Sequence, residues 1–171
     1  ADVMFVYGEQ TKVESSQKDA ELVVDTLRTL AKDPQLEFEL DLDLRPEGKN
    51  GPIARSIDSY AAYYSRWGDV WENQALLRAR MIFGSELLVR NFSALVDEYR
   101  YPKELPSSSI IEIRRIKARV EAERLPQGAD PKRHLKLGRG SLSDIEWLVQ
   151  LLQLQFGNLN PEVRTPKTLE G

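Results

Sequence analysis

The sequence of 171 residues contains no cysteine. This absence excludes disulfide bonds, zinc–thiolate sites and a cysteine nucleophile. There is one histidine, His134, so a metal site built from several histidines is excluded as well. No apolar run approaches the length of a membrane span. With none of these features in the sequence, we expect a cytoplasmic protein.

The charged side chains are unevenly distributed. The net charge is −3, but residues 1–50 carry twelve acidic and six basic side chains, and residues 111–140 carry nine basic and four acidic ones. Such runs are typical of solvated helix faces. They also fit an acidic part that holds metal ions and a basic part that meets polyphosphate or an acidic partner. The basic run is not interleaved with aromatic residues, which disfavours a nucleic-acid enzyme.

Two segments combine the pattern of a β-strand with carboxylates. Residues 2–7 are apolar apart from Asp2, and residues 35–44 alternate apolar with acidic side chains. Residues i and i+2 of a strand point to one face, so Asp41 and Asp43 are predicted to stand side by side, against a strand that carries Asp2. Gathered carboxylates are costly unless they hold cations. Oxygen ligands suit Mg²⁺, and such a site fits phosphoryl or nucleotidyl transfer.

The remaining sequence is predominantly helical. The spacing of apolar residues predicts helices over 16–32, 56–65, 69–82, 85–99, 108–123 and 143–156. Ser109 with Glu112 and Ser143 with Glu146 fit the capping box, and Gly157 is expected to end the last helix. The predicted fold is α+β and mostly α, with an α/β piece over 1–52 and an all-helical domain over 53–171. Two strands are marginal alone, so we expect them to pack on the helical part or on further strands that this sequence does not contain.

Five motifs occur in order along the chain. They are ADVMFVY (1–7), DLDLRPEGKNGP (41–52), WENQALLRAR (71–80), IRRIKARVE (113–121) and KLGRGSLSDIEW (136–147). Together they closely resemble the glutamine synthetase adenylyltransferase family, in a form like that of actinobacteria, over essentially the whole chain. The resemblance implies an incomplete polymerase-β-like nucleotidyltransferase sheet of two to three strands with a helix, followed by a helical domain.

The resemblance also implies a function. One half of such an enzyme transfers AMP from ATP to a tyrosine of glutamine synthetase and releases pyrophosphate, and the other half removes AMP by phosphorolysis. The motifs SDIE (143–146) and LLRAR (76–80) are more similar to the adenylylating half. The implied protein is a multifunctional, magnesium-dependent, ATP-binding nucleotidyltransferase of nitrogen metabolism, with glutamine synthetase and the PII signalling protein as partners. Two alternatives stay open: the deadenylylating half, and a non-catalytic fragment that docks on glutamine synthetase or PII.

The metal ligands follow from the same resemblance. The family's metal motif begins with Gly-Ser and then D-x-D, and Asp2 matches the second aspartate of that pair. The first aspartate would lie upstream of residue 1, so we expect the chain by itself to be inactive. Asp41 matches the third carboxylate. Asp2 and Asp41 are therefore predicted to be catalytic and to bind two Mg²⁺ ions, and Asp41 is a candidate to accept the tyrosine proton. Asp43 is either a further metal ligand or a solvent-facing residue.

Several cations are candidates to bind ATP. Arg45, Lys49 and Arg55 follow the metal strand, and arginine suits phosphate oxygens because it binds them in a bidentate manner. Arg45 is equally suited to pair with Glu47 or with the acidic strand. Lys136 and Arg139 precede the last predicted helix and are candidates to contact ATP or the protein substrate.

The role of three further sets of residues is predicted from their positions. Asp144 and Glu146 open the last helix, where negative charge is favourable against the helix dipole, or they lie near the active site. Five aromatic residues are predicted to pack helices rather than stack on adenine: Tyr60, Tyr63, Tyr64, Trp67 and Trp71. His134 is expected at the surface.

Overall fold

The computed structural model describes residues 2–8, 13–32, 39–130 and 132–168. The chain divides into two compact units. The first unit is Ala1–Gly68 with Phe83–Ser93, and the second unit is Asp69–Ile82 with Ala94–Gly171. The mixed and mostly helical fold is confirmed. The domain boundary predicted after residue 52 stays a prediction.

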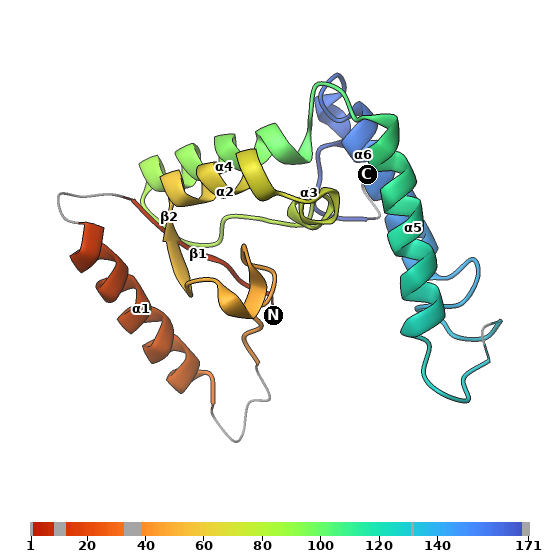
Figure 1. Ribbon diagram of the computed structural model, residues 1–171, viewed down its shortest axis with the longest axis horizontal. Coiled ribbons are helices and arrows are strands. Elements are labelled where there is room, and N and C mark those ends of the chain that lie inside the picture. The colour runs from red at the N-terminus through yellow and green to blue at the C-terminus, as the bar shows by residue number, and fades with distance from the viewer. Residues whose placement is uncertain (1, 9–12, 33–38, 131, 169–171) are drawn as a thin grey trace. The chain divides into compact units, whose positions relative to one another are not determined.

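The first unit contains a short parallel sheet (Figure 1). Strand β1 (Phe5–Tyr7) pairs with β2 (Ala54–Ser56), with Val6 opposite Arg55. An isolated parallel bridge joins Asp2 to Asp41, and the Val3 amide donates to the Asp41 carbonyl at 2.8 Å. The segment just before β1 therefore pairs with the segment around Asp41, whereas β1 itself pairs with β2.

Six α-helices are present among the described residues. They are α1 (Val13–Leu30), α2 (Ile57–Trp67), α3 (Val70–Leu76), α4 (Glu86–Arg100), α5 (Ser107–Glu123) and α6 (Leu142–Phe156). Two short 3₁₀ helices cover Gly48–Asn50 and Pro161–Val163. Five of the six helix predictions are confirmed, with ends shifted by three residues or fewer. The prediction of a helix over 69–82 is wrong in its second half, since α3 ends at Leu76.

None of the helices in the described ranges is long and apolar enough to cross a membrane.

The strand predicted over 35–44 is not continuous. Residues 33–38 lie outside the described residues, and from 39 to 44 only Asp41 takes part in a ladder. The Asp41 carboxylate accepts the Asp43 amide at 2.8 Å, so the chain turns where the prediction has it extended. The second strand of the sheet is instead β2, which the sequence reading missed. This segment is only three residues long and is followed directly by α2, so it has no alternating pattern.

The two predicted capping boxes are wrong. Helix α5 follows Pro106 and α6 follows Ser141, so Ser109 and Ser143 lie inside their helices, where they cannot take the extended cap conformation. A capping box does occur at α3, between Asp69 and Glu72. The prediction for Gly157 is confirmed, because this residue is the C-cap of α6 and its amide donates to the Gln153 carbonyl at 2.8 Å.

An aromatic cluster forms the core of the first unit. Tyr60 of α2 is fully buried, and its ring packs edge-to-face on Phe92 of α4 with the centroids 5.0 Å apart. Tyr64 stacks beside it at 6.1 Å. Burial raises the pKa of the Tyr60 hydroxyl, which lies 3.5 Å from the Phe5 carbonyl oxygen of β1. The packing role predicted for Tyr60 and Tyr64 is confirmed, whereas Trp67 is 72% exposed and does not pack a core.

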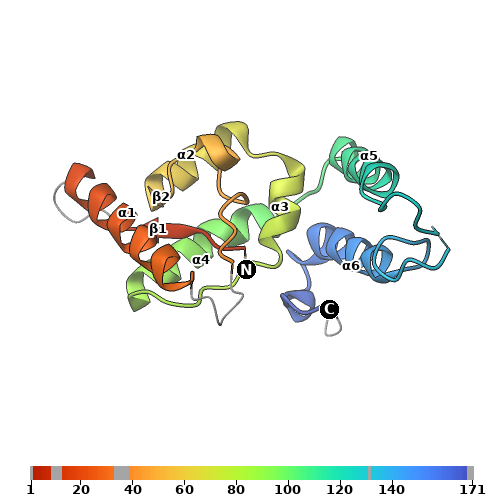
Figure 2. The same cartoon turned by 90° about the horizontal axis from the view of Figure 1, so that it is seen from below.

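The second unit has its own core, and in Figures 1 and 2 helices α5 and α6 run side by side. Its buried members are Leu77, Tyr101, Ile113 and Leu154. The guanidinium groups of Arg100 and Arg164 lie 5.2 and 4.8 Å from the Tyr101 ring centroid. The buried Gln153 amide of α6 donates to the Val163 and Thr165 carbonyls, so the chain after α6 is held against this helix.

A glycine substitution tests the tight turn before β2. A methyl group at position 51 would overlap with the Pro46 carbonyl oxygen, which is backbone and cannot move aside cheaply. We expect Gly51→Ala to lower the free energy of unfolding by about 1–3 kcal/mol in urea titrations. Gly8→Ala is the matched control, since its methyl group would meet only Leu88 Cδ1, at an ordinary 3.7 Å. Equal stability of the two variants would contradict the described turn.

Candidate active site

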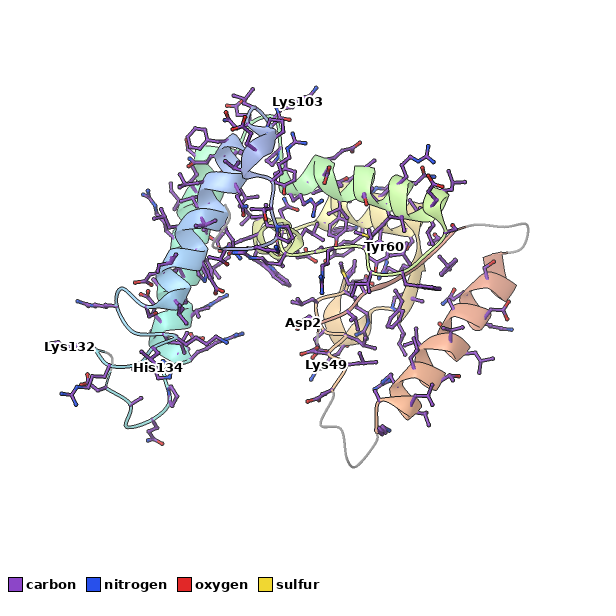
Figure 3. The ribbon with its side chains drawn as sticks, turned by 180° about the vertical axis from the view of Figure 1, so that it is seen from behind. Asp2, Lys49, Tyr60, Lys103, Lys132 and His134 are labelled. Carbon is purple, nitrogen blue, oxygen red and sulfur yellow. The ribbon has the colours of Figure 1, made fainter. Side chains whose placement is uncertain are left out.

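Two exposed carboxylates are neighbours at the edge of the sheet. Asp2 and Asp41 are partners in the parallel bridge, and both are exposed. Directly paired residues of adjacent strands lie about 4.8 Å apart and point to one face. Figure 3 shows Asp2 and Lys49 in the same region of the first unit. The sequence therefore predicted correctly that the chain segments carrying Asp2 and Asp41 are adjacent.

Asp43 is oriented differently from the sequence prediction. It follows the turn made by the Asp41 carboxylate, and it does not continue a strand. The Asp43 carboxylate lies 3.5 Å from Lys49 Nζ and 4.0 Å from Arg45 Nη1. Two cations therefore offset the charge of Asp43, whereas neither Asp2 nor Asp41 has an ion-pair partner among the described residues.

Arg45 holds the turn together from inside. Its side chain is buried, and its guanidinium donates to the Leu42 carbonyl at 2.6 Å, the Gly51 carbonyl at 3.2 Å and the Lys49 carbonyl at 3.5 Å. These three carbonyls lie on both arms of the turn over 42–51. The side chains of Leu42 and Pro46 are buried as well. The observed contacts of Arg45 are thus structural, and its predicted contact with ATP stays a prediction.

Arg55 and Glu47 form a second link across the turn. Arg55 is mostly buried at β2, forms an ion pair with Glu47 and donates to Ser59 Oγ at 3.2 Å. Glu47 has the left-handed backbone conformation (φ 64°), which is strained for a residue with a Cβ. The ion pair offsets part of that strain. Sequence reasoning missed this pair, since residues 47 and 55 are too far apart for a local pattern.

The carboxylates of Asp2 and Asp41 fit a hard divalent cation in their chemistry. Both offer only oxygen donors, and proteins hold Mg²⁺ with one or two carboxylates while substrate phosphates and water complete the shell. Among the described residues, no group of three or more acidic, histidine or cysteine side chains could hold a metal by itself. The pair therefore fits an ion that arrives with a phosphate ligand better than a closed protein site.

The two remaining candidate cations belong to the second unit. Lys136 and Arg139 are exposed in the connection between α5 and α6, which also contains His134 (Figure 3). The Lys136 carbonyl accepts the Ser141 hydroxyl at 2.7 Å, and His134 Nδ1 accepts the Leu137 amide at 2.9 Å. His134 thus supports the connection locally, although it was expected only to lie at the surface.

A lysine joins this connection to both helices. Lys117 of α5 forms ion pairs with Glu121 and with Asp144 in the first turn of α6. Asp144 also accepts the Gly140 amide at 2.6 Å. The hydrogen bond from Lys117, and then that from Gly140, hold the pKa of Asp144 below its ordinary value. Partial burial would lower the pKa of Lys117, but its hydrogen bonds to the two carboxylates raise it overall. The i, i+4 spacing could have predicted the ion pair between Lys117 and Glu121 from the sequence. No local pattern could have predicted the contact with Asp144, which is 27 positions away.

The structural role of Arg45 can be tested by substitution. Arg45→Met would leave buried carbonyls without donors, so we expect the free energy of unfolding to fall by about 2 kcal/mol or more. Lys49→Met is the control, because the Lys49 side chain is 82% exposed and its loss is expected to cost about 0.5 kcal/mol or less. If both variants unfold at the same urea concentration as the parent chain, Arg45 does not hold the turn.

A pH series tests the Asp144 network. We expect Asp144→Asn to lower the free energy of unfolding by about 1–2 kcal/mol at neutral pH, where the carboxylate is charged. The folded-state pKa of Asp144 is lowered, so its contribution is present above the unfolded value of about 3.9 and is lost as the pH falls below it. The difference from the parent chain should therefore shrink toward pH 3. The exposed Glu146→Gln is the control, and a constant difference at all pH values would contradict the role of the charge.

Comparisons with known proteins agree with this geometry. The family model described as "Glutamate-ammonia ligase adenylyltransferase" matches residues 1–95. A protein of Leifsonia xyli subsp. xyli is 53% identical in an alignment 171 residues long, which covers 99% of this chain and 17% of that protein. One of Streptomyces avermitilis is 53% identical over 98% of this chain, and one of Mycobacterium tuberculosis is 49% identical over 99% of it.

All three relatives bear the name "Bifunctional glutamine synthetase adenylyltransferase/adenylyl-removing enzyme". The chain spans 17% to 18% of the length of these relatives. The matched family model covers more than half of the chain, in the part that contains the sheet, the Asp2–Asp41 bridge and the turn over 42–51. The chain therefore belongs to the glutamate-ammonia ligase adenylyltransferase family.

Proposed function

We propose that the chain forms part of a centre that transfers AMP from ATP to a tyrosine of glutamine synthetase, and so takes part in regulating nitrogen assimilation. The bridge between Asp2 and Asp41 is the observation that supports this most directly, because it makes two exposed aspartates partners on neighbouring segments. The names of the relatives agree with the proposed reaction.

In this reaction the tyrosine oxygen attacks the α-phosphorus of ATP. A bond forms between the tyrosine oxygen and the α-phosphorus, the bond from that phosphorus to the bridging oxygen breaks, and pyrophosphate leaves. The hydroxyl proton must also leave, since a free tyrosine has a pKa near 10. We propose that the Asp41 carboxylate, which is exposed, accepts this proton.

Asp2 and Asp41 would hold Mg²⁺ together with phosphate oxygens of ATP. A bound Mg²⁺ would supply charge that offsets the negative charge of the triphosphate. Lys49 is exposed and lies on the same turn, so it would meet the phosphates as a mobile cation. Arg45 and Arg55 would act indirectly, since their contacts hold the turn that carries Asp41 and Lys49. Asp43, which faces Lys49, would set the position of that lysine.

The direction of the reaction is part of the proposal. The relatives' names include both an adenylylating and an adenylyl-removing activity. We assign this chain to the adenylylating half, on the motifs over 143–146 and 76–80. Lys136 and Arg139, which are exposed beside the first of these motifs, would contact ATP or the protein substrate. PII would act as a regulator in the same assembly.

The test uses the longer native polypeptide that contains this chain. It is incubated with Mg²⁺-ATP and glutamine synthetase, and the intact mass of the synthetase subunit is recorded. We expect one AMP per modified subunit, and we expect Asp41→Asn to slow its addition at least about 100-fold. Asp25→Asn, an exposed change on α1, is the control and should leave the rate unchanged.

Three results would contradict the proposal. Full activity of Asp41→Asn would remove the catalytic role of this carboxylate. Loss of phosphate-dependent AMP release in Asp41→Asn, with addition of AMP from ATP unchanged, would assign the chain to the adenylyl-removing half. Binding to glutamine synthetase that is unaffected by both Asp2→Asn and Asp41→Asn, with neither activity present, would identify a docking module.

A further inference from the structure

Helix α6 is apolar on two sides, and only one of them is covered. Its buried side contains Leu154, which belongs to the core of the second unit. Its other side exposes apolar residues three or four positions apart: Leu142, Ile145, Leu148, Leu152 and Phe156. Leu142 is 62% exposed and Leu148 is 58% exposed. Helices that are apolar all round are buried in complete proteins, so this exposed stripe needs a partner.

A groove between α5 and α6 continues the stripe. It has a volume of about 280 Å³ and is lined on the α6 side by Trp147, Leu148 and Leu151, and on the α5 side by residues that include Ile113 and Ala118. Leu148 belongs to both the stripe and the groove. The stripe and the groove therefore form one apolar surface along two neighbouring helices, which we call the α5–α6 face.

Two basic and two acidic side chains line the groove, and one of the basic ones has no ion-pair partner among the described residues. Lys117 is neutralised by Glu121 and Asp144. Arg114 also lines the groove, is exposed and has no ion-pair partner among the residues that the structure describes. The α5 side of the groove thus offers one free positive charge beside an apolar floor, and a carboxylate on an incoming segment would satisfy it.

The shape of this surface fits a third helix. Two neighbouring helices leave a groove that takes an apolar ridge of another helix, as in helical bundles. The residues that line the groove recur every three or four positions on both α5 and α6, which matches such a ridge. A second copy of the chain is a poorer fit, because an isologous pairing would bring two copies of Arg114 to the same interface.

The length of the relatives indicates where such a helix comes from. The chain matches only 17% to 18% of each relative, so most of each relative's polypeptide lies outside the matched part. A segment on the same polypeptide has a high effective concentration at this surface. We propose that the α5–α6 face binds an amphipathic helix from the remaining part of the same polypeptide, with an acidic residue placed toward Arg114. This inference does not depend on the proposed reaction.

Thiol labelling tests the inference without any catalytic readout. The chain has no cysteine, so Leu148→Cys and Leu152→Cys each introduce one thiol into it. Reaction with a maleimide is followed by mass spectrometry of the peptide that contains the substitution. In the longer native polypeptide, we expect both thiols to react at least about tenfold more slowly than an exposed thiol introduced by Glu123→Cys, because labelling then needs local opening.

Glu123→Cys is the matched control. It is exposed at the end of α5 and lies outside the groove, so its thiol should react without local opening in the same polypeptide. Combining Arg114→Glu with Leu148→Cys should raise the labelling rate in the longer polypeptide, whereas Arg114→Lys should not.

Three outcomes would overturn the inference. Labelling of Leu148→Cys and Leu152→Cys as fast as that of Glu123→Cys would mean that the face stays open. Labelling that is slow at high protein concentration and becomes faster on dilution would assign the face to a second copy. Slow labelling that appears only after glutamine synthetase is added would assign it to that protein. Each result is independent of whether AMP transfer occurs.

Discussion

One buried guanidinium organises the part of the molecule that carries the candidate chemistry. Arg45 donates to carbonyls on both arms of the turn over 42–51, and the Arg55–Glu47 ion pair links the same turn to β2. Buried carbonyls without donors are costly, so the turn has one preferred conformation while Arg45 is present. That conformation sets Asp41 beside Asp2 and turns Asp43 toward Lys49. The turn is therefore the reason why Asp43 has ion-pair partners and Asp41 has none among the described residues.

The second unit depends on a different kind of constraint. Its connection between α5 and α6 is held by Lys117, Asp144 and the Gly140 amide, while a small core packs α3, α5 and α6. The outer side of α6 is as apolar as its inner side, although no described residue covers it. The proposed helix from the same polypeptide would cover this surface. Family membership agrees with this view, because the relatives are much longer than the chain.

The sequence predicted the helices well because their apolar residues recur every three or four positions, a local signal that packing then preserves. It also predicted that Asp2 and Asp41 lie on neighbouring segments. It failed where contacts between distant residues decide the conformation. The alternation of apolar and acidic residues predicts an extended strand, but hydrogen bonds of the Asp41 and Arg45 side chains bend the chain there. Strand β2 was missed because three residues are too few to show a periodic pattern. Trp67 was expected to pack because it is large and apolar, but it lies at the end of α2 and is exposed.

The proposed active site depends on Asp2 and Asp41 together binding a divalent cation that carries the phosphates of ATP. Crystals of the longer native polypeptide, grown with Mn²⁺ and a non-hydrolysable ATP analogue, would allow the ion to be located by anomalous scattering. We expect an anomalous peak in contact with the carboxylates of both Asp2 and Asp41 and with phosphate oxygens of the analogue. A bound analogue whose metal ion contacts neither carboxylate would contradict this expectation.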